Sequence, residues 1–367
     1  MDHTLRLLFI VLLAALAGCS NPSEAYDFDV PFGFPQPRVP ADNPMSDAKV
    51  ELGRHLFYDT QLSGNETQSC ASCHHQELAF TDGLARAEGS TGQIHPRGSM
   101  SLANVGYAAT LTWASSVLRN LEDQALVPMF GENPVELGLL DQDMLIERLR
   151  GNERYQTLFP AAYPDDADPF TLEHVVGALA AFQRTLISGD SAYDRYLAGD
   201  HDALSDAALR GADIFFGEEA ECFHCHGGFL FSSGVDHEGN VFDQATFQNN
   251  GLYNLDGRGA YPPDNQGLYE QTEDPADIGA FKPPTLRNIA LTAPYMHDGS
   301  LETLDDVLTM YAAGGHDSPE SGDGSLNPNK SPFVNGFDEA LIPDLRAFLE
   351  SLTDDSFLTD PRFSDPW

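Results

Sequence analysis

The chain has 367 residues and a formal net charge of −38, with 57 acidic against 19 basic side chains. Nucleic-acid binding requires a basic surface, so this balance excludes a nucleic-acid partner. It allows electrostatic attraction of a basic partner, although a solvated surface is the simpler explanation for most of these charges.

The first 19 residues have the pattern of a secretory signal, with Arg6 followed by an apolar run from Leu7 to Ala17. This run is too short to remain as a membrane-spanning helix. Its end, Leu16-Ala17-Gly18-Cys19, resembles a bacterial lipoprotein cleavage site, which implies that Cys19 becomes the lipidated N-terminus and the only membrane anchor. Ser20 favours the outer membrane over the inner one. The alternative is an ordinary secretory signal, and both predict export to the periplasm.

Downstream of this signal, residues 20–44 are rich in Pro, Asp and Ser and predict a flexible tether. Roughly 320 residues remain, enough for two domains, which we place at 45–200 and 201–367. Helical periodicity dominates, and no long alternating β-branched run occurs. The predicted helices are Asp47–Tyr58, Thr171–Ser188, Ser205–Phe216, one that opens at Thr303 and ends at Gly314-Gly315, and Pro343–Leu352.

Two cysteine motifs follow predicted helices, one in each half: Cys70-Ala71-Ser72-Cys73-His74 and Cys222-Phe223-His224-Cys225-His226. The pattern C-x-x-C-H attaches c-type haem, with two thioether bonds from the sulfurs and an iron ligand from the histidine. A zinc site would bring its cysteine pairs within about 15–20 residues. A disulfide redox pair would lack the following histidine. The sequence therefore favours two covalent haems and a redox protein.

Each half repeats one order of elements: a helix, a haem motif and a long loop, of which Gly227–Pro284 is the longest. This repeat predicts a mainly α fold with two cytochrome c-like domains. Each domain would form around one covalent haem, with long irregular loops covering the haem edges.

Two C-terminal segments extend the argument from haem to a family. The segments Phe281-Lys282-Pro283-Pro284-Thr285-Leu286-Arg287-Asn288 and Leu291-Thr292-Ala293-Pro294-Tyr295-Met296-His297-Asp298-Gly299 resemble the C-terminal motif of bacterial di-haem cytochrome c peroxidases and MauG enzymes. Gln124-Ala125, Pro128 and Asn133-Pro134-Val135-Glu136 resemble the distal wall of their peroxidatic haem. The resemblance extends from about Asp47 to Leu352.

The resemblance implies roles for residues around the N-terminal haem. His74 would bind the iron, and the opposite side would stay open for hydrogen peroxide. Glu136 would move the peroxide proton to the leaving oxygen, while Gln124 and Pro128 would shape the pocket. Two extra residues separate Pro128 from Glu136 relative to the peroxidase pattern.

At the second haem, His226 would be one iron ligand, and the identity of the opposite ligand separates the branches of the family. That ligand is Met in the peroxidases and Tyr in MauG-like enzymes. Counting from Pro294, the family spacing reaches Tyr311, which lies on an apolar helical stripe with Met310 at its edge. A thioether favours ferrous iron, whereas a phenolate stabilises higher oxidation states. The alternative for Tyr311 is an aromatic residue of the core.

Between the haems, the resemblance places Trp113 as a relay for charge, and the alternative is a core tryptophan. It also implies a calcium ion held by the backbone carbonyls of Thr292 and Pro294, since such hard oxygens suit this ion. Gly98 stands near an Asn of the peroxidases, so no side-chain ligand is assigned. We expect His297 to be structural.

Two further segments, at 97–104 and 121–132, most resemble the MbnH-type di-haem enzymes, which are encoded beside a small copper-binding partner, MbnP. This resemblance implies a peroxidase-type oxidoreductase that reacts with hydrogen peroxide and forms a high-valent di-haem state. It would then oxidise a Trp on the small exported partner to kynurenine.

Two rival functions stay open. A di-haem cytochrome c peroxidase would reduce hydrogen peroxide with electrons from a small cytochrome c, and would use Met310 or Met296 in place of Tyr311. An electron-transfer cytochrome would have two six-coordinate haems and would not react with peroxide. Glu136 and an open distal side argue against this second rival.

Overall fold

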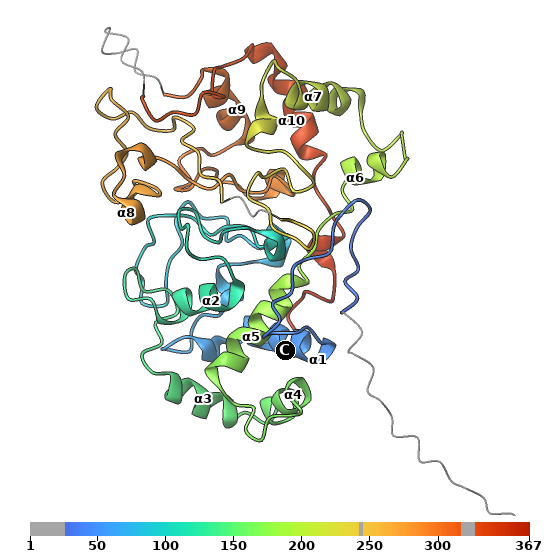
Figure 1. Cartoon of the computed structure of the whole chain (residues 1–367), viewed down its shortest axis with the longest axis vertical. Helices are drawn as coiled ribbons and strands as arrows, with labels where there is room; N and C mark the ends of the chain where they lie inside the picture. Colours follow the sequence, from blue (N-terminus) through green and yellow to red (C-terminus); the bar gives the residue numbers. More distant parts are fainter. Residues whose placement is uncertain (1–25, 242–244, 317–326) are drawn as a thin grey trace, which may run out of the picture.

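A computed structural model describes residues 26–241, 245–316 and 327–367 of the chain (Figure 1). The predicted signal and its lipidation site, Cys19, lie outside the described residues. Within the ranges that are described, no helix is both long and apolar enough to cross a membrane.

Short helices joined by long loops make up the described chain, and extended segments meet only in isolated bridges such as Tyr295 with Leu301. The mainly α prediction is therefore confirmed. The α-helices are α1 (Asp47–Tyr58), α2 (Leu121–Phe130), α3 (Gln142–Arg150), α4 (Tyr155–Ala162), α5 (Leu172–Arg184), α6 (Ala192–Leu197), α7 (Asp206–Phe216), α8 (Tyr269–Thr272), α9 (Leu304–Ala312) and α10 (Ile342–Glu350).

Helix starts follow the capping signals in the sequence. Thr171, Ser205 and Thr303 are the N-caps of α5, α7 and α9, and each side chain accepts a hydrogen bond from a backbone N–H three residues later. Thr303 also forms a capping box with Asp306. The predicted helices before the haem motifs, at Thr303 and at the C-terminus are confirmed.

One helix crossing occurs in both halves of the molecule. The helix before each haem motif crosses a second helix at a glycine, α1 against α5 and α7 against α10 (Figure 1). A Cβ on Gly53 would clash with the backbone carbonyl of Ala178, and one on Gly211 would clash with that of Asp344. The sequence repeat is therefore also a structural repeat, since both glycines permit the same close backbone contact.

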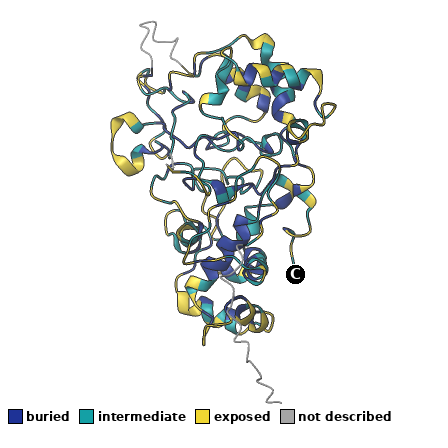
Figure 2. Ribbon diagram, turned by 45° about the vertical axis from the view of Figure 1, so that its right-hand side comes forward, coloured by how far each residue is buried: buried dark blue, intermediate teal, exposed yellow. Residues whose placement is uncertain are grey.

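Each crossing lies within its own apolar core, seen as the two groups of dark blue helices in Figure 2. The N-terminal core includes Leu52, Phe57 and Phe182, and the C-terminal core includes Phe215 and Phe348, all at most 2% exposed. The two cores fit two haem-bearing units, and the boundary between residues 200 and 201 stays a prediction.

The last residues return to the N-terminal half, and the C-terminus lies beside α1 in Figure 1. Phe357 and Phe363 pack in the N-terminal core. The Gln76 side chain donates hydrogen bonds to the carbonyls of Phe357 and Asp360, at 3.0 and 2.9 Å. The two halves are thus joined by the end of the chain as well as by the linker near residue 200.

Candidate haem sites

The first haem motif forms a compact turn with its histidine held in one orientation. Cys70 opens a short 3₁₀ helix, Cys70–Ser72, that is closed by a capping box between Ser69 and Ser72. The Nδ1 atom of His74 lies 2.7 Å from the carbonyl oxygen of Phe80. A carbonyl only accepts hydrogen bonds, so Nδ1 carries the proton and the Nε2 lone pair is left for a metal.

The second motif repeats this geometry. Cys222–His224 is again a 3₁₀ helix, and Nδ1 of His226 lies 3.0 Å from the carbonyl oxygen of Phe231. A proximal haem ligand requires this fixed tautomer and ring orientation. Both histidines therefore have the tautomer and ring orientation that an iron ligand requires, and their role stays a prediction.

Neither alternative for the cysteines fits as well as haem. The four motif cysteines are not joined in disulfides, and burial raises the pKa of Cys70 and Cys222 to about 12. Reactive redox thiols have lowered pKa values. Across the described parts of the chain, no group of three or more His, Cys, Asp or Glu side chains could hold a metal ion.

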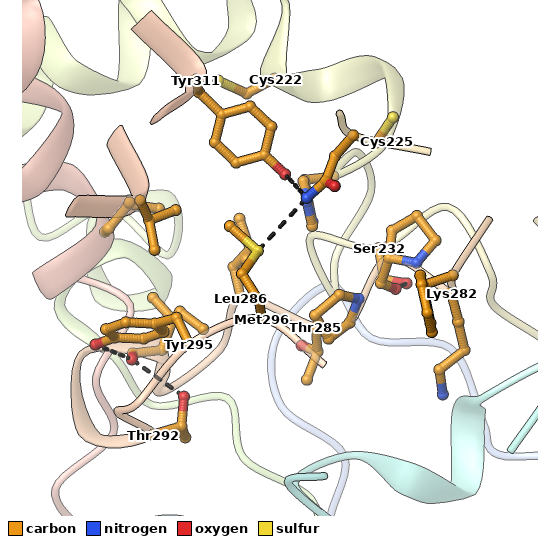
Figure 3. A pocket seen from close by; sticks show the side chains of 18 of the residues that line it. Cys222, Cys225, Ser232, Lys282, Thr285, Leu286, Thr292, Tyr295, Met296 and Tyr311 are labelled. Carbon is orange, nitrogen blue, oxygen red and sulfur yellow. Dashed lines mark hydrogen bonds between the residues drawn. The ribbon is translucent and has the colours of Figure 1, made fainter. Parts of the chain in front are cut away.

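A cavity of about 360 Å³ adjoins the second motif. Cys222, Cys225, His226 and Tyr311 line it, and Figure 3 shows Tyr311 pointing into it beside the cysteines. Most of the remaining lining near the motif is apolar, as a porphyrin requires: Phe215, Leu286, Leu304, Leu308, Leu345 and Leu349. The residues present therefore fit a haem c.

Two cations line the same cavity and suit the carboxylates of a haem. The Lys282 ammonium donates to the carbonyl of Thr110 at 2.9 Å, and burial lowers its pKa to about 8. A propionate beside it would favour the charged form. Arg287 is fixed by a two-pronged bond to the buried carboxylate of Asp194, at 2.8 and 2.9 Å.

Asn250 joins two candidate iron ligands. Its side-chain nitrogen donates to the phenol oxygen of Tyr311 at 3.1 Å and to the sulfur of Met296 at 3.4 Å, the two dashed lines that meet in Figure 3. Burial raises the pKa of Tyr311 to about 12, against the lowering effect of Asn250. Met310 is buried and is not among the described residues that line the cavity.

At the N-terminal haem, a fold-back brings the predicted distal residues together. Helix α2 carries Gln124 and, one turn later, Pro128. The segment after α2 turns back on it, since the backbone N–H of Leu137 donates to the carbonyl of Pro128 at 2.8 Å. Glu136 therefore lies beside Pro128 despite the two extra residues of the loop.

The environment of Glu136 favours proton transfer. Burial raises the pKa of this carboxyl group. Burial is the main cause of the raised pKa values of Cys70 and Cys73, and the charge of Glu136 is a further cause. Glu136 therefore lies near the first haem motif. A carboxyl group with a raised pKa beside a peroxide site can both accept and return a proton.

Trp113 lies where the two halves meet. Its indole N–H donates to the carbonyl of Gly98 at 2.8 Å, and its own carbonyl accepts from the backbone N–H of Lys282 at 2.8 Å. It lines the same cavity as Tyr311 and Asp82. A relay between the haems requires such a position at the junction.

The predicted calcium residues, Thr292 and Pro294, line this cavity as well. Sequence reasoning missed Asp82, a carboxylate on the same lining, and Asn250. Asn250 lies in the long loop, where no periodicity or motif marks it. Lys282 and Arg287 stood inside a quoted family motif, and only the structure shows that they line the cavity.

Comparisons with known proteins agree with this geometry. A family model described as di-haem cytochrome c peroxidase matches residues 47–202. Cytochrome-c peroxidase IdrP1 of Denitromonas iodatirespirans is 34% identical over 380 residues, covering 100% of this chain and 96% of the relative. Methylamine utilization protein MauG of Methylorubrum extorquens is 34% identical over 325 residues, covering 89% and 83%.

Among solved structures, the chain is similar to a crystal structure described as a MauG-like protein associated with microbial copper homeostasis. The TM-score is 0.89 and the sequence identity 47%, over 94% of this chain and 100% of the other.

Proposed function

This chain belongs to the di-haem cytochrome c peroxidase family, which implies two haem c groups and a peroxidase-type oxidoreductase, and within that family we propose a MauG-like function. The enzyme would use hydrogen peroxide to oxidise a side chain on a small partner protein. The observation that carries this proposal is the phenol of Tyr311 in the cavity beside Cys222, Cys225 and His226.

The N-terminal half would receive the peroxide. His74 would hold the iron, which, when bound, accepts electrons from elsewhere in the protein and passes them to the peroxide oxygens. Glu136 would take the proton of the incoming peroxide and give it to the departing oxygen, as a general base and then a general acid. Pro128 and Gln124 would restrict the space above the iron.

The C-terminal half would supply part of the electrons that the peroxide accepts. Tyr311 and His226 would bind the second iron, and Asn250 would orient the phenol through its hydrogen bond. A phenolate donates electron density, which suits an iron that is oxidised and not one that must first be reduced. Trp113, at the junction, would carry charge between the two haems.

We also propose a calcium ion at the same junction. The carbonyl oxygens of Thr292 and Pro294 would be its ligands, and Asp82 is a candidate carboxylate because it lines the same cavity. Such an ion would fix the turn that precedes α9 and therefore the position of Tyr311.

The finer assignment is an MbnH-type enzyme. We propose a Trp of a small copper-binding protein as the substrate and kynurenine as its product. The segments at 97–104 and 121–132 support this branch, as does the 47% identity to the MauG-like protein associated with copper homeostasis. The enzyme would be periplasmic, and lipidation of Cys19 would anchor it to the outer membrane.

A cytochrome c peroxidase is the second candidate. One specific observation favours it, because Met296 lies in the same cavity and shares Asn250 with Tyr311. The relative named cytochrome-c peroxidase IdrP1 is as similar in identity as the relative named MauG. Met296 would then replace Tyr311 as the ligand, and a small cytochrome c would supply electrons.

The deciding experiment adds one equivalent of hydrogen peroxide to the fully ferric protein and records Mössbauer and near-infrared spectra. In a MauG-like enzyme, the spectra of both irons should change together without prior reduction of the protein. The Tyr311→Met variant should lose this response. A protein that responds only after a donor has reduced the second haem is a cytochrome c peroxidase.

A further inference from the structure

We propose that Tyr253 and Asp298 form a proton-coupled oxidation site through which oxidising equivalents leave the enzyme for its protein substrate. This inference rests on the proposed peroxide-dependent function and adds the exit route to it. The substrate surface would dock over Tyr253.

The pair has the geometry that tyrosine oxidation needs. The phenol of Tyr253 donates a 2.6 Å hydrogen bond to a carboxylate oxygen of Asp298. Asp298 is 8% exposed, and its other oxygen accepts from the backbone N–H of Ser300 at 3.2 Å. Tyr253 itself is partly exposed.

The hydrogen bond sets the resting state of the pair, because the phenol of Tyr253 donates its proton toward the carboxylate of Asp298. Burial and Asp298 raise the pKa of Tyr253, so the phenol stays protonated until it is oxidised.

An aromatic cluster connects this pair to the cavity of the second haem. Trp113, Tyr253 and Met296 all pack against a buried cluster that includes Tyr261 and Phe281. The rings of Tyr253 and Tyr261 are 5.5 Å apart between centroids, and those of Tyr261 and Phe281 are 6.2 Å apart. These ring contacts link partly exposed Tyr253 to Phe281, which lines the cavity together with Trp113.

Among the described residues, Tyr253 is the one tyrosine in this cluster whose phenol donates to a carboxylate. Tyr261 lies in the cluster, but its phenol donates to the amide oxygen of Asn249, which is a poor base. Tyr155 makes an equivalent 2.6 Å bond to Asp59, but it is fully buried and packs in the N-terminal core. Tyr253 combines a carboxylate base, ring contacts toward the cavity and partial exposure.

One electron passes from Tyr253 to the oxidised haem pair while the phenol O–H bond breaks and its proton binds the carboxylate of Asp298. The neutral tyrosyl radical then takes one electron from the substrate side chain, and Asp298 returns the proton. Hydrogen peroxide is the oxidant, and it accepts two electrons and two protons to become water, so two such cycles consume one peroxide.

The test is freeze-quench electron paramagnetic resonance on the holoenzyme after addition of hydrogen peroxide without a partner. Wild type should give a tyrosyl radical whose signal narrows with ring-deuterated tyrosine. Tyr253→Phe should abolish this signal, and Asp298→Asn should slow its appearance at least tenfold. Tyr155→Phe is the matched control, since it removes the other tyrosine–carboxylate bond and should retain the radical.

Each other outcome overturns the proposal. A radical that persists in Tyr253→Phe, or is lost instead in Tyr155→Phe, assigns it to another residue. If peroxide changes the haem spectrum but wild type shows no tyrosyl radical, the exit site is wrong and the proposed function stands. If peroxide changes nothing in the haem spectrum, both are wrong.

Discussion

The side-chain nitrogen of Asn250 and the phenol oxygen of Tyr311 are 3.1 Å apart. The amide oxygen of Asn250 accepts from the backbone N–H of Leu252 at 3.2 Å, which turns the nitrogen toward the cavity. The second N–H of this amide is directed at the sulfur of Met296. One backbone contact therefore positions a donor against both side chains that could bind the second iron.

Replacement of Asn250 by Leu should lower the reduction potential of the C-terminal haem. A phenolate that loses a hydrogen-bond donor gives more electron density to the iron and stabilises its oxidised form. We expect a shift of about 60 mV, which is a tenfold change for one electron. Spectroelectrochemical titration measures it.

Met296→Leu is the matched control, because it leaves the bond between Asn250 and Tyr311 intact. Its potential should stay close to that of wild type. If the reduction potential shifts strongly in Met296→Leu and does not shift in Asn250→Leu, Met296 is the iron ligand. That result would favour the cytochrome c peroxidase.

Glu136→Gln should slow the reaction with hydrogen peroxide by about 10²-fold or more, the usual contribution of a general acid–base group. The amide keeps the size of the side chain and cannot accept the proton. Stopped-flow absorbance of the haem measures the rate. Glu132→Gln, four residues earlier on the exposed part of the same loop, should react like wild type.

The same carboxyl group sets a pH dependence. Burial raises the pKa of Glu136 above its ordinary value. Since the peroxide proton must pass to the carboxylate, the rate should rise as pH increases through this raised pKa and then level off. The rise should be missing in Glu136→Gln. An unchanged pH profile in that variant would assign the proton acceptor to another group.

Local signals predicted much of this architecture. Caps such as Thr171 and Thr303 placed helix starts correctly, because a side chain that satisfies a free N–H acts within three residues. The motif histidines were predictable for a similar reason, since their hydrogen-bond partners, Phe80 and Phe231, follow within six residues.

What the sequence did not predict depends on contacts between distant segments. Helices α2, α3, α4, α6 and α8 were missed, although Asp141 caps α3. The pairing of Tyr253 with Asp298 joins positions 45 residues apart, and that of Asn250 with Tyr311 joins positions 61 apart. The loop that carries both donors has no periodicity, so only the folded chain shows which side chains they meet.

Gly53→Ala and Gly211→Ala should each lower the free energy of unfolding by about 1–3 kcal/mol or more, the usual cost of overpacking. The added methyl group would press on the carbonyl of Ala178 or Asp344 and separate two helices at a haem-bearing core. Urea unfolding of the holoprotein measures the loss. Gly151→Ala is the control, since its Cβ would meet only ordinary contacts and its φ is −72°. Equal stability of all the variants would mean that the crossings are looser than described.

Asp354 should make the stability of the protein sensitive to acid. One of its carboxylate oxygens accepts hydrogen bonds from the Ser188 hydroxyl and from the backbone N–H groups of Gly189 and Asp190, at 3.0, 2.9 and 3.1 Å. It therefore ties the return of the C-terminal chain to the end of the N-terminal half. Burial opposes ionisation, but the hydrogen bonds hold the pKa of Asp354 below its ordinary value.

Because its pKa is lowered on folding, Asp354 stabilises the fold fully above its unfolded pKa of about 3.9 and loses this effect as pH falls through the lower folded value. Asp354→Asn should therefore cost about 1.5–3 kcal/mol at neutral pH, the range for hydrogen bonds to a charged group. Its deficit relative to wild type should shrink below about pH 4. Urea unfolding at a series of pH values measures both. The exposed neighbour Asp355, changed to Asn, should behave like wild type throughout. A deficit that stays constant down to the acid range would mean that the contribution of Asp354 does not depend on its charge.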